Sequence, residues 1–128
     1  MNFRPTFTKE ERISSQKEID FLFNERSSFV VYPLRIIYTE RETISEIPAS
    51  ILISVSKKRF KRAVKRNRLK RLIREAYRLN KSDFLECLSS QNKQLLVSFL
   101  YISNELCSYS EMETAMKKAL NTLKQKIA

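Results

Sequence analysis

The chain contains no histidine and no glycine among its 128 residues. Without histidine it lacks the commonest general base and the commonest metal ligand of proteins. Without glycine it cannot form a glycine-rich phosphate-binding loop. Its two cysteines, Cys87 and Cys107, have no CxxC spacing. They cannot complete a four-ligand zinc site, and we predict two buried, reduced thiols.

The chain also lacks any long apolar run. No segment approaches the ~20 apolar residues that a membrane-spanning helix requires, and the first residues show no apolar core of a secretion signal. A hydrophobic fraction of 42%, with eight Phe and five Tyr, favours a folded globule over a disordered chain. We therefore expect one cytoplasmic domain over residues 1–128, with residues 1–13 as a flexible arm.

The net charge of +11 is concentrated in residues 57–78, KKRFKRAVKRNRLKRLIREAYR. This segment holds twelve basic residues and one acid, Glu75, whereas the rest of the chain has thirteen of each. A solvated helix surface normally mixes both signs, so the excess predicts a surface that binds a polyanion. RNA, DNA and an anionic membrane are the alternatives. The membrane ranks last, because the apolar side of this segment is needed to cover a sheet.

Apolar periodicity predicts six elements in the order α-β-β-α-β-α. These are helices over 15–24 and 62–80 with a third from about residue 110, and strands over 29–38, 49–56 and 94–102. The motifs Ser15–Glu18 and Ser110–Glu113 predict capping boxes, and residues 39–48 predict a hairpin loop. Residues 81–93 are polar with one short apolar patch. We expect an α+β fold, a two-layer sandwich with the helices on a small mixed sheet.

The helix predicted over 62–80 has two chemically different sides. Its apolar stripe consists of Leu69, Leu72, Ile73, Ala76 and Tyr77. Its opposite side carries Asn67, Lys70, Arg71, Arg74 and Arg78. The first turns break the pattern, because Arg62, Lys65 and Arg66 fall at the angle of the apolar stripe. We predict that these turns extend beyond the core or face a cleft.

Three neighbouring segments resemble the bacterial ribonuclease P protein family: Ser54–Lys58 (SVSKK), Ala63–Val64, and residues 66–77 (RNRLKRLIREAY). The last contains the RNR motif of that family, followed by its [IL]-K-R-x-x-R-E pattern. The resemblance implies the protein subunit of a ribonucleoprotein endonuclease that removes the 5′ leader from precursor tRNA. It also implies a fold like domain 2 of ribosomal protein S5, with a left-handed βαβ crossover where the general rule is right-handed.

The resemblance also assigns residues to two RNA-facing surfaces. For the catalytic RNA it implies Arg62, Arg66, Asn67, Arg68, Lys70, Arg71 and Arg74. For the single-stranded leader it implies a cleft lined by Phe23, Ile36, Tyr38, Ser54, Lys57, Arg66 and Lys70, with Tyr32 as an alternative to Tyr38. It implies no catalytic side chain and no metal held by protein side chains alone, since Mg²⁺ would be bound mainly by the RNA. The expected partners are ribonuclease P RNA, in a 1:1 complex with a monomeric protein, and precursor tRNA.

Two other functions stay open. The chain could be an RNA- or ribosome-binding module without a part in cleavage. It could also bind DNA through residues 62–80, although a strand rather than a short helix is predicted before that segment, unlike a helix-turn-helix. Stimulation of leader removal by a ribonuclease P RNA would separate these functions.

Overall fold

The computed structural model describes residues 11–13, 15–24, 27–41 and 47–127. In chain order the elements are α1 (Gln16–Asn24), β1 (Ser28–Val31), β2 (Leu34–Glu40), β3 (Ala49–Val55), α2 (Ala63–Asn80), α3 (Ser82–Ser90), β4 (Leu95–Tyr101) and α4 (Tyr109–Ile127). The strands form one mixed sheet in the order β1-β2-β4-β3. Among these four strands, only β3 and β4 pair in parallel. The α+β fold and the mixed sheet are therefore as predicted.

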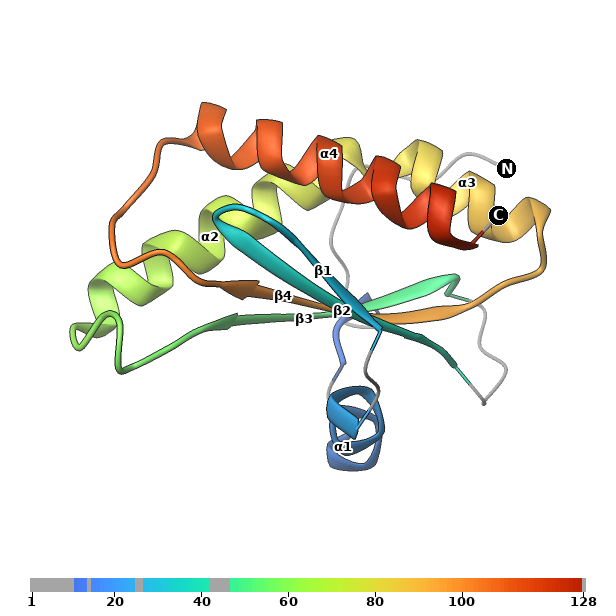
Figure 1. The fold of residues 1–128 in the computed structure, drawn as a ribbon, viewed down its shortest axis with the longest axis horizontal. Coiled ribbons are helices and arrows are strands. Elements are labelled where there is room, and N and C mark those ends of the chain that lie inside the picture. Colours follow the sequence, from blue (N-terminus) through green and yellow to red (C-terminus); the bar gives the residue numbers. More distant parts are fainter. Residues whose placement is uncertain (1–10, 14, 25–26, 42–46, 128) are drawn as a thin grey trace.

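Helices lie on both faces of the sheet, but unequally (Figure 1). The helical face is covered by α2, α3 and α4, and the main core between them includes Leu34, Ile36 and Phe99. The opposite face, here called the α1 face, carries α1 alone. Leu22 of α1 is fully buried there in a small cluster with Ile13 and Leu96. As far as the described residues go, the second face of the sheet is thus only partly covered.

The predicted strand over 29–38 is in fact a hairpin of two strands. β1 and β2 meet at a turn formed by Tyr32 and Pro33. Proline has no backbone N–H to contribute to a ladder, and Pro33 instead offers its carbonyl oxygen to the Ile102 N–H at 2.8 Å. The predicted hairpin between β2 and β3 is wrong, because β4 lies between them. Residues 42–46 of that predicted loop lie outside the described residues.

A short helix, α3, was missed. Its buried residues Phe84, Leu85 and Leu88 cover barely two turns, too few for periodicity to separate a helix from a loop. The capping box of α4 was placed two residues late. Ser108 Oγ accepts from the Glu111 N–H at 3.1 Å, and the Ser108 N–H donates to Glu111 Oε1 at 3.3 Å. This reciprocal pair begins α4 at Tyr109.

The connection from β3 to β4 runs through α2 and α3 on the helical face (Figure 1). It makes the two strands parallel neighbours, as a crossover must, and its left-handed sense stays a prediction. The predicted free thiols are present, because Cys87 and Cys107 form no disulfide. Both are half-buried rather than fully buried.

Residues 11–13 do not behave as the predicted flexible arm. Glu11 and Ile13 are 5% and 6% exposed. The Ile13 N–H donates to the Ile51 carbonyl oxygen at 3.0 Å, next to a parallel bridge between Arg12 and Ile51. This short segment therefore docks on the outer edge of β3. Residues 1–10 of the predicted arm lie outside the described residues.

Candidate nucleic-acid interface

The basic surface of α2 is built by a helix with one apolar side. Leu69, Ile73, Ala76 and Tyr77 are fully buried under α2, which leaves the cations to face outward. Of the side chains predicted to contact RNA, four are exposed and three half-buried. The exposed ones are Arg62, Asn67, Arg68 and Arg71, and the half-buried ones are Arg66, Lys70 and Arg74.

These cations are barely neutralised by the protein itself. Within the described part of the chain, the only α2 cation in an ion pair is Arg78, which contacts Glu75. That hydrogen-bonded contact lowers the pKa of Glu75 and raises the pKa of Arg78. Uncompensated like charges on one helix repel one another, and a polyanion relieves that repulsion. No described helix combines the length and the apolar character needed to cross a bilayer.

The first turns of α2 extend beyond the core, as predicted, and residues 61–65 are exposed. Arg66 does not follow them. Its Nη1 donates to the carbonyl oxygens of Phe60 and Lys61, each at 2.8 Å. Arg66 therefore uses two of its five donors inside the protein. Its predicted role as an RNA ligand rests on the remaining three.

Residues 56–62, here called the basic loop, are held in place at several points. The Ser56 carbonyl oxygen accepts from the N–H groups of Arg59 and Phe60, at 3.3 and 3.1 Å. Phe60 is 6% exposed, and its ring centroid lies 6.0 Å from that of Tyr101. Arg59 Nη1 donates to Asn104 Oδ1 at 2.9 Å. The loop is thus an anchored platform, from which exposed cations such as Lys57 project.

The predicted leader cleft combines residues from opposite faces of the sheet. Ser54 shares the α1 face with Leu52, because side chains two positions apart on a strand point the same way. Ile36 is fully buried in the main core on the helical face. Tyr38 packs on that same core, its ring edge-on to Phe29 with centroids 6.0 Å apart. Ile36 and Tyr38 cannot line a cleft with Ser54, so this part of the prediction is wrong by one strand position.

Four side chains, Ser54 among them, form a row across the α1 face, one from each strand. Ser54 lies opposite Leu100, Leu100 opposite Arg35, and Arg35 opposite Val30. All four are at least partly exposed, and Val30 is 51% exposed. We call these residues the floor row. Sequence reasoning missed three of them, although Arg35 is signalled by a lone charge within an apolar strand.

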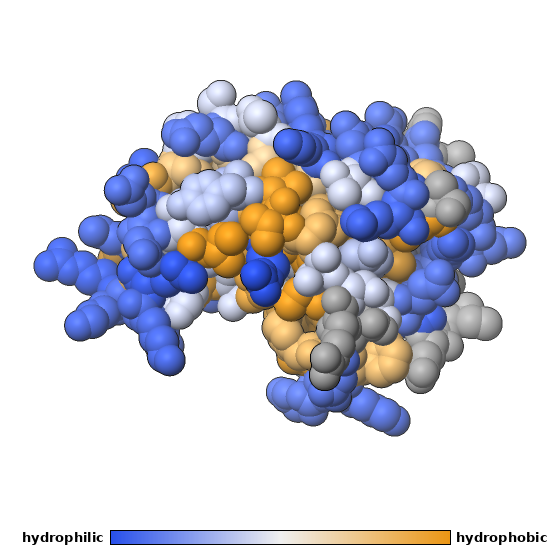
Figure 2. Space-filling model, viewed as in Figure 1, coloured by the Kyte–Doolittle hydropathy of each residue, from blue (hydrophilic) through white to orange (hydrophobic). Residues whose placement is uncertain are grey.

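The floor row lies between two walls, which are α1 on one side and the basic loop on the other. Figure 2 shows the molecule hollowed below the sheet, between α1 and the basic residues where β3 leads into α2. Phe23 on α1 is 45% exposed and Tyr32 in the hairpin turn is 68% exposed. The Phe23 ring is therefore accessible from the groove. Tyr32 instead lines a pocket with Ser110 and Thr114 of α4, and Tyr38 packs on the main core. The predicted positions Phe23, Ser54 and Lys57 remain compatible with this groove.

A contact between α2 and α4 fixes the helical layer behind the basic surface. Glu113 Oε2 accepts from Asn80 Nδ2 at 3.2 Å and from the Tyr109 hydroxyl at 3.0 Å. These hydrogen bonds lower the pKa of Glu113 below its ordinary value of 4.5. Burial, followed by the bond to Glu113, raises the pKa of Tyr109 to about 12.

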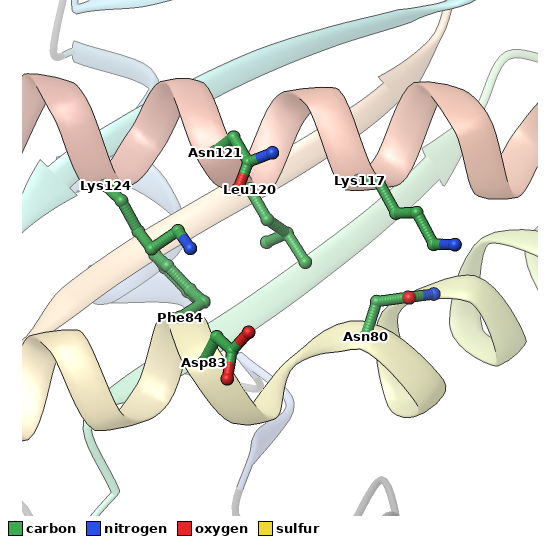
Figure 3. Close-up of a pocket in the computed structure, with 7 residues that line it drawn as sticks. All are labelled: Asn80, Asp83, Phe84, Lys117, Leu120, Asn121 and Lys124. Carbon is green, nitrogen blue, oxygen red and sulfur yellow. The ribbon is translucent and has the colours of Figure 1, made fainter.

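A small pocket between the helices has a different chemistry. It has a volume of about 240 Å³ and lies where α2 passes into α3, facing α4 (Figure 3). Lys117 and Lys124 of α4 line it together with Asp83 of α3 and Asn80 of α2. Its charges are mixed, and it lies on the helical side of the sheet, away from the floor row. It is therefore not part of the candidate interface.

Comparison with known proteins settles the family. The sequence profile described as Ribonuclease P matches residues 7–124. The chain belongs to the Ribonuclease P family. It is 45% identical to the ribonuclease P protein component of Porphyromonas gingivalis, over 94% of this chain and 89% of that protein. It is 34% identical to that of Clostridium acetobutylicum, over 88% of each chain.

Solved ribonuclease P proteins share the fold. A mutant of the Staphylococcus aureus RNase P protein superposes with a TM-score of 0.71 at 22% identity, covering 91% of this chain and 90% of that one. The RNase P protein of Thermotoga maritima gives 0.65 at 22% identity, covering 90% and 96%. The predicted family and the α+β fold class are thereby confirmed.

Proposed function

We propose that the chain is the RNA-binding protein subunit of a ribonuclease P that removes the 5′ leader from precursor tRNA. The observation that carries this is the pairing of two surfaces at one end of the molecule. One is the uncompensated basic side of α2, and the other is the groove over the floor row. The first suits the phosphates of a folded RNA, and the second suits a single strand that passes between walls.

The catalytic RNA is assigned to α2 and the basic loop. Arg68 and Arg71 are exposed on α2, and exposed guanidinium groups bind phosphate oxygens in two-pronged fashion. Asn67, which directly precedes Arg68, is also exposed and can donate to or accept from a base or sugar. Arg62, Lys70 and Arg74 extend the same surface in both directions along the helix.

The leader is assigned to the groove on the α1 face. Apolar Val30 and Leu100 flank Arg35 in the floor row, so a planar guanidinium lies among surfaces on which bases can stack. Phe23 supplies an accessible aromatic ring on the α1 wall. Contacts of this kind tolerate any base sequence, which suits a subunit that must accept leaders of many sequences.

The cleavage chemistry is assigned to the RNA partner. Within the described residues no three Cys, Asp or Glu side chains gather as metal ligands. We propose that Mg²⁺ is bound mainly by the RNA and that the protein contributes binding alone. We further propose that the protein is monomeric, that it binds the RNA in a 1:1 complex and that it acts in the cytoplasm.

Reconstitution tests the function. The purified chain is added to a bacterial ribonuclease P RNA and a precursor tRNA with a labelled 5′ end, at a Mg²⁺ concentration too low for the RNA to act alone. Stimulated release of the leader is expected, because protein cations replace part of the missing counterions. Tight RNA binding without stimulation would favour a binding module outside the cleavage reaction, and selective binding of duplex DNA would favour the DNA-binding alternative.

A further inference from the structure

A buried ion pair links the segment before α1 to the junction between α2 and α3. Lys81 Nζ lies 2.7 Å from both Glu11 Oε1 and Glu11 Oε2. Lys81 is 2% exposed and Glu11 is 5% exposed. Lys81 is also the single residue between α2 and α3. Two charges are taken out of water here to join parts of the chain that are 70 residues apart.

The segment that carries Glu11 passes from one side of the sheet to the other. Glu11 meets Lys81 in the helical layer, while Ile13 packs with Leu22 of α1 and with Leu96 on the α1 face. Between them, the backbone bonds to Ile51 on the outer edge of β3. Residues 11–13, here called the strap, therefore wrap the β3 edge and lead into α1 (Figure 1).

The strap also lies close to the buried side of the RNA-binding helix. Tyr77, fully buried under α2, has its pKa raised first by burial and then by the charge of Glu11. The Tyr77 ring centroid lies 6.0 Å from that of Phe99 in the main core. Glu11 therefore lies beside α2, the junction between α2 and α3, and the main core. These surroundings hold Glu11 in place.

We propose that Glu11 and Lys81 are positioning residues for leader binding, because their ion pair fixes the strap and thereby the place of α1 as one wall of the groove. Neither residue touches the leader. The inference rests on the proposed function, since it assigns the α1 face to the leader.

The physical basis is the cost of an unpaired buried charge. Breaking a buried pair by removing one partner leaves the other charge without compensation, whereas replacing both with apolar groups of similar volume is often neutral or stabilising. Glu11→Gln should therefore loosen the strap. The double variant Glu11→Leu/Lys81→Met should hold it through apolar contact. α1 is otherwise held by a small apolar cluster and by the ion pair between Glu18 and Arg41 at 3.1 Å, so its docking should respond to the strap.

The experiment uses the reconstituted holoenzyme with two substrates, a precursor with a multi-nucleotide leader and the mature tRNA without one. Dissociation constants are measured for wild type, Glu11→Gln, Lys81→Met and the double variant. Glu86→Gln, an exposed acid on α3, is the matched control. Hydrogen exchange of the α1 amides in the free protein reports whether α1 is docked.

We expect Glu11→Gln and Lys81→Met to accelerate hydrogen exchange of the α1 amides. Both should also lower the affinity for the leader-bearing substrate about tenfold, which corresponds to the loss of roughly one stacked base. Binding of mature tRNA and of the ribonuclease P RNA should stay unchanged. The double variant should recover both α1 protection and leader affinity. Glu86→Gln should match wild type in every measurement.

The proposal is overturned if α1 exchange and leader affinity fail to move together in any folded variant, or if both substrates weaken equally. If a single variant does not fold, α1 exchange and affinity for the leader-bearing substrate are measured in the double variant, and these two results decide the proposal. A wild-type holoenzyme that does not prefer the leader-bearing substrate would instead refute the proposed leader groove. The two failures are therefore distinguishable.

Discussion

Arg66 Nη1 donates to the carbonyl oxygen of Phe60 at 2.8 Å, so the first arginine of the RNR motif is bound to the loop that precedes its own helix. Phe60 in turn is buried against Tyr101. The contact joins the start of α2 to the basic loop. The positions of the loop cations therefore depend on Arg66, a residue that the sequence assigns to RNA binding alone.

The structural part of the Arg66 role can be separated from its charge. Arg66→Gln should accelerate exchange of the Arg59 and Phe60 amides in the RNA-free protein, because a lost charge-assisted hydrogen bond is worth about 1.5–3 kcal/mol. Arg68→Gln, on an exposed side chain, should leave these amides unchanged. Amide exchange followed by NMR is the measurement. Equal exchange in both variants would contradict this structural role and would mean that Arg66 acts as an ordinary surface cation.

Arg68 should contribute to RNA binding through phosphate contact. Arg68→Ala should weaken the complex with ribonuclease P RNA and reduce the slope of log affinity against log salt by roughly 0.7–0.9 for each lost phosphate contact. The slope is obtained from filter binding at salt concentrations between about 50 and 200 mM. Lys117→Ala, on an exposed α4 lysine that lines the small pocket outside the interface, is the control and should leave the slope unchanged.

Arg35 and Tyr38 test which face of the sheet meets the leader. Arg35→Ala should weaken only substrates with a leader, by about 1–2 kcal/mol, with little effect on the free energy of unfolding. Tyr38→Ala should instead lower the free energy of unfolding by roughly 1–3 kcal/mol, because it removes a ring packed on the main core. Substrate binding and denaturant unfolding are compared for both variants. A leader-specific defect in a stable Tyr38→Ala protein would contradict the register of β2.

The Glu113 contact predicts an acid-sensitive link between α2 and α4. The pKa of Glu113 is lowered in the folded protein, so its contribution is complete above its ordinary value of 4.5 and is lost as pH falls through the lower folded value. Thermal unfolding below pH 4.5 should therefore show a smaller pH dependence for Glu113→Gln than for wild type. Glu111→Gln would disturb the α4 cap, so Glu86→Gln is the better control.

Much of the fold follows from local patterns along the chain. The helix over Ala63–Asn80 and the strands over Ala49–Val55 and Leu95–Tyr101 lie within one residue of prediction, since each carries a clear period and a definite end. The segment predicted as one strand over 29–38 forms two strands, because Pro33, which has no backbone N–H for a ladder, lies in the turn between them. The helix α3 was missed because its apolar residues span too short a segment.

The amino-acid sequence by itself determined that one segment carries all of the net charge, that its helix has one apolar side, and that the chain carries the RNR motif of its family. These properties depend on composition and spacing, which are local. Only the tertiary structure decided which face each strand residue occupies, because a shift of one position exchanges the two faces of a strand. It alone turned Arg66 toward Phe60 and brought Glu11 to Lys81. Contacts between distant residues depend on how the layers pack, and no local pattern contains that information.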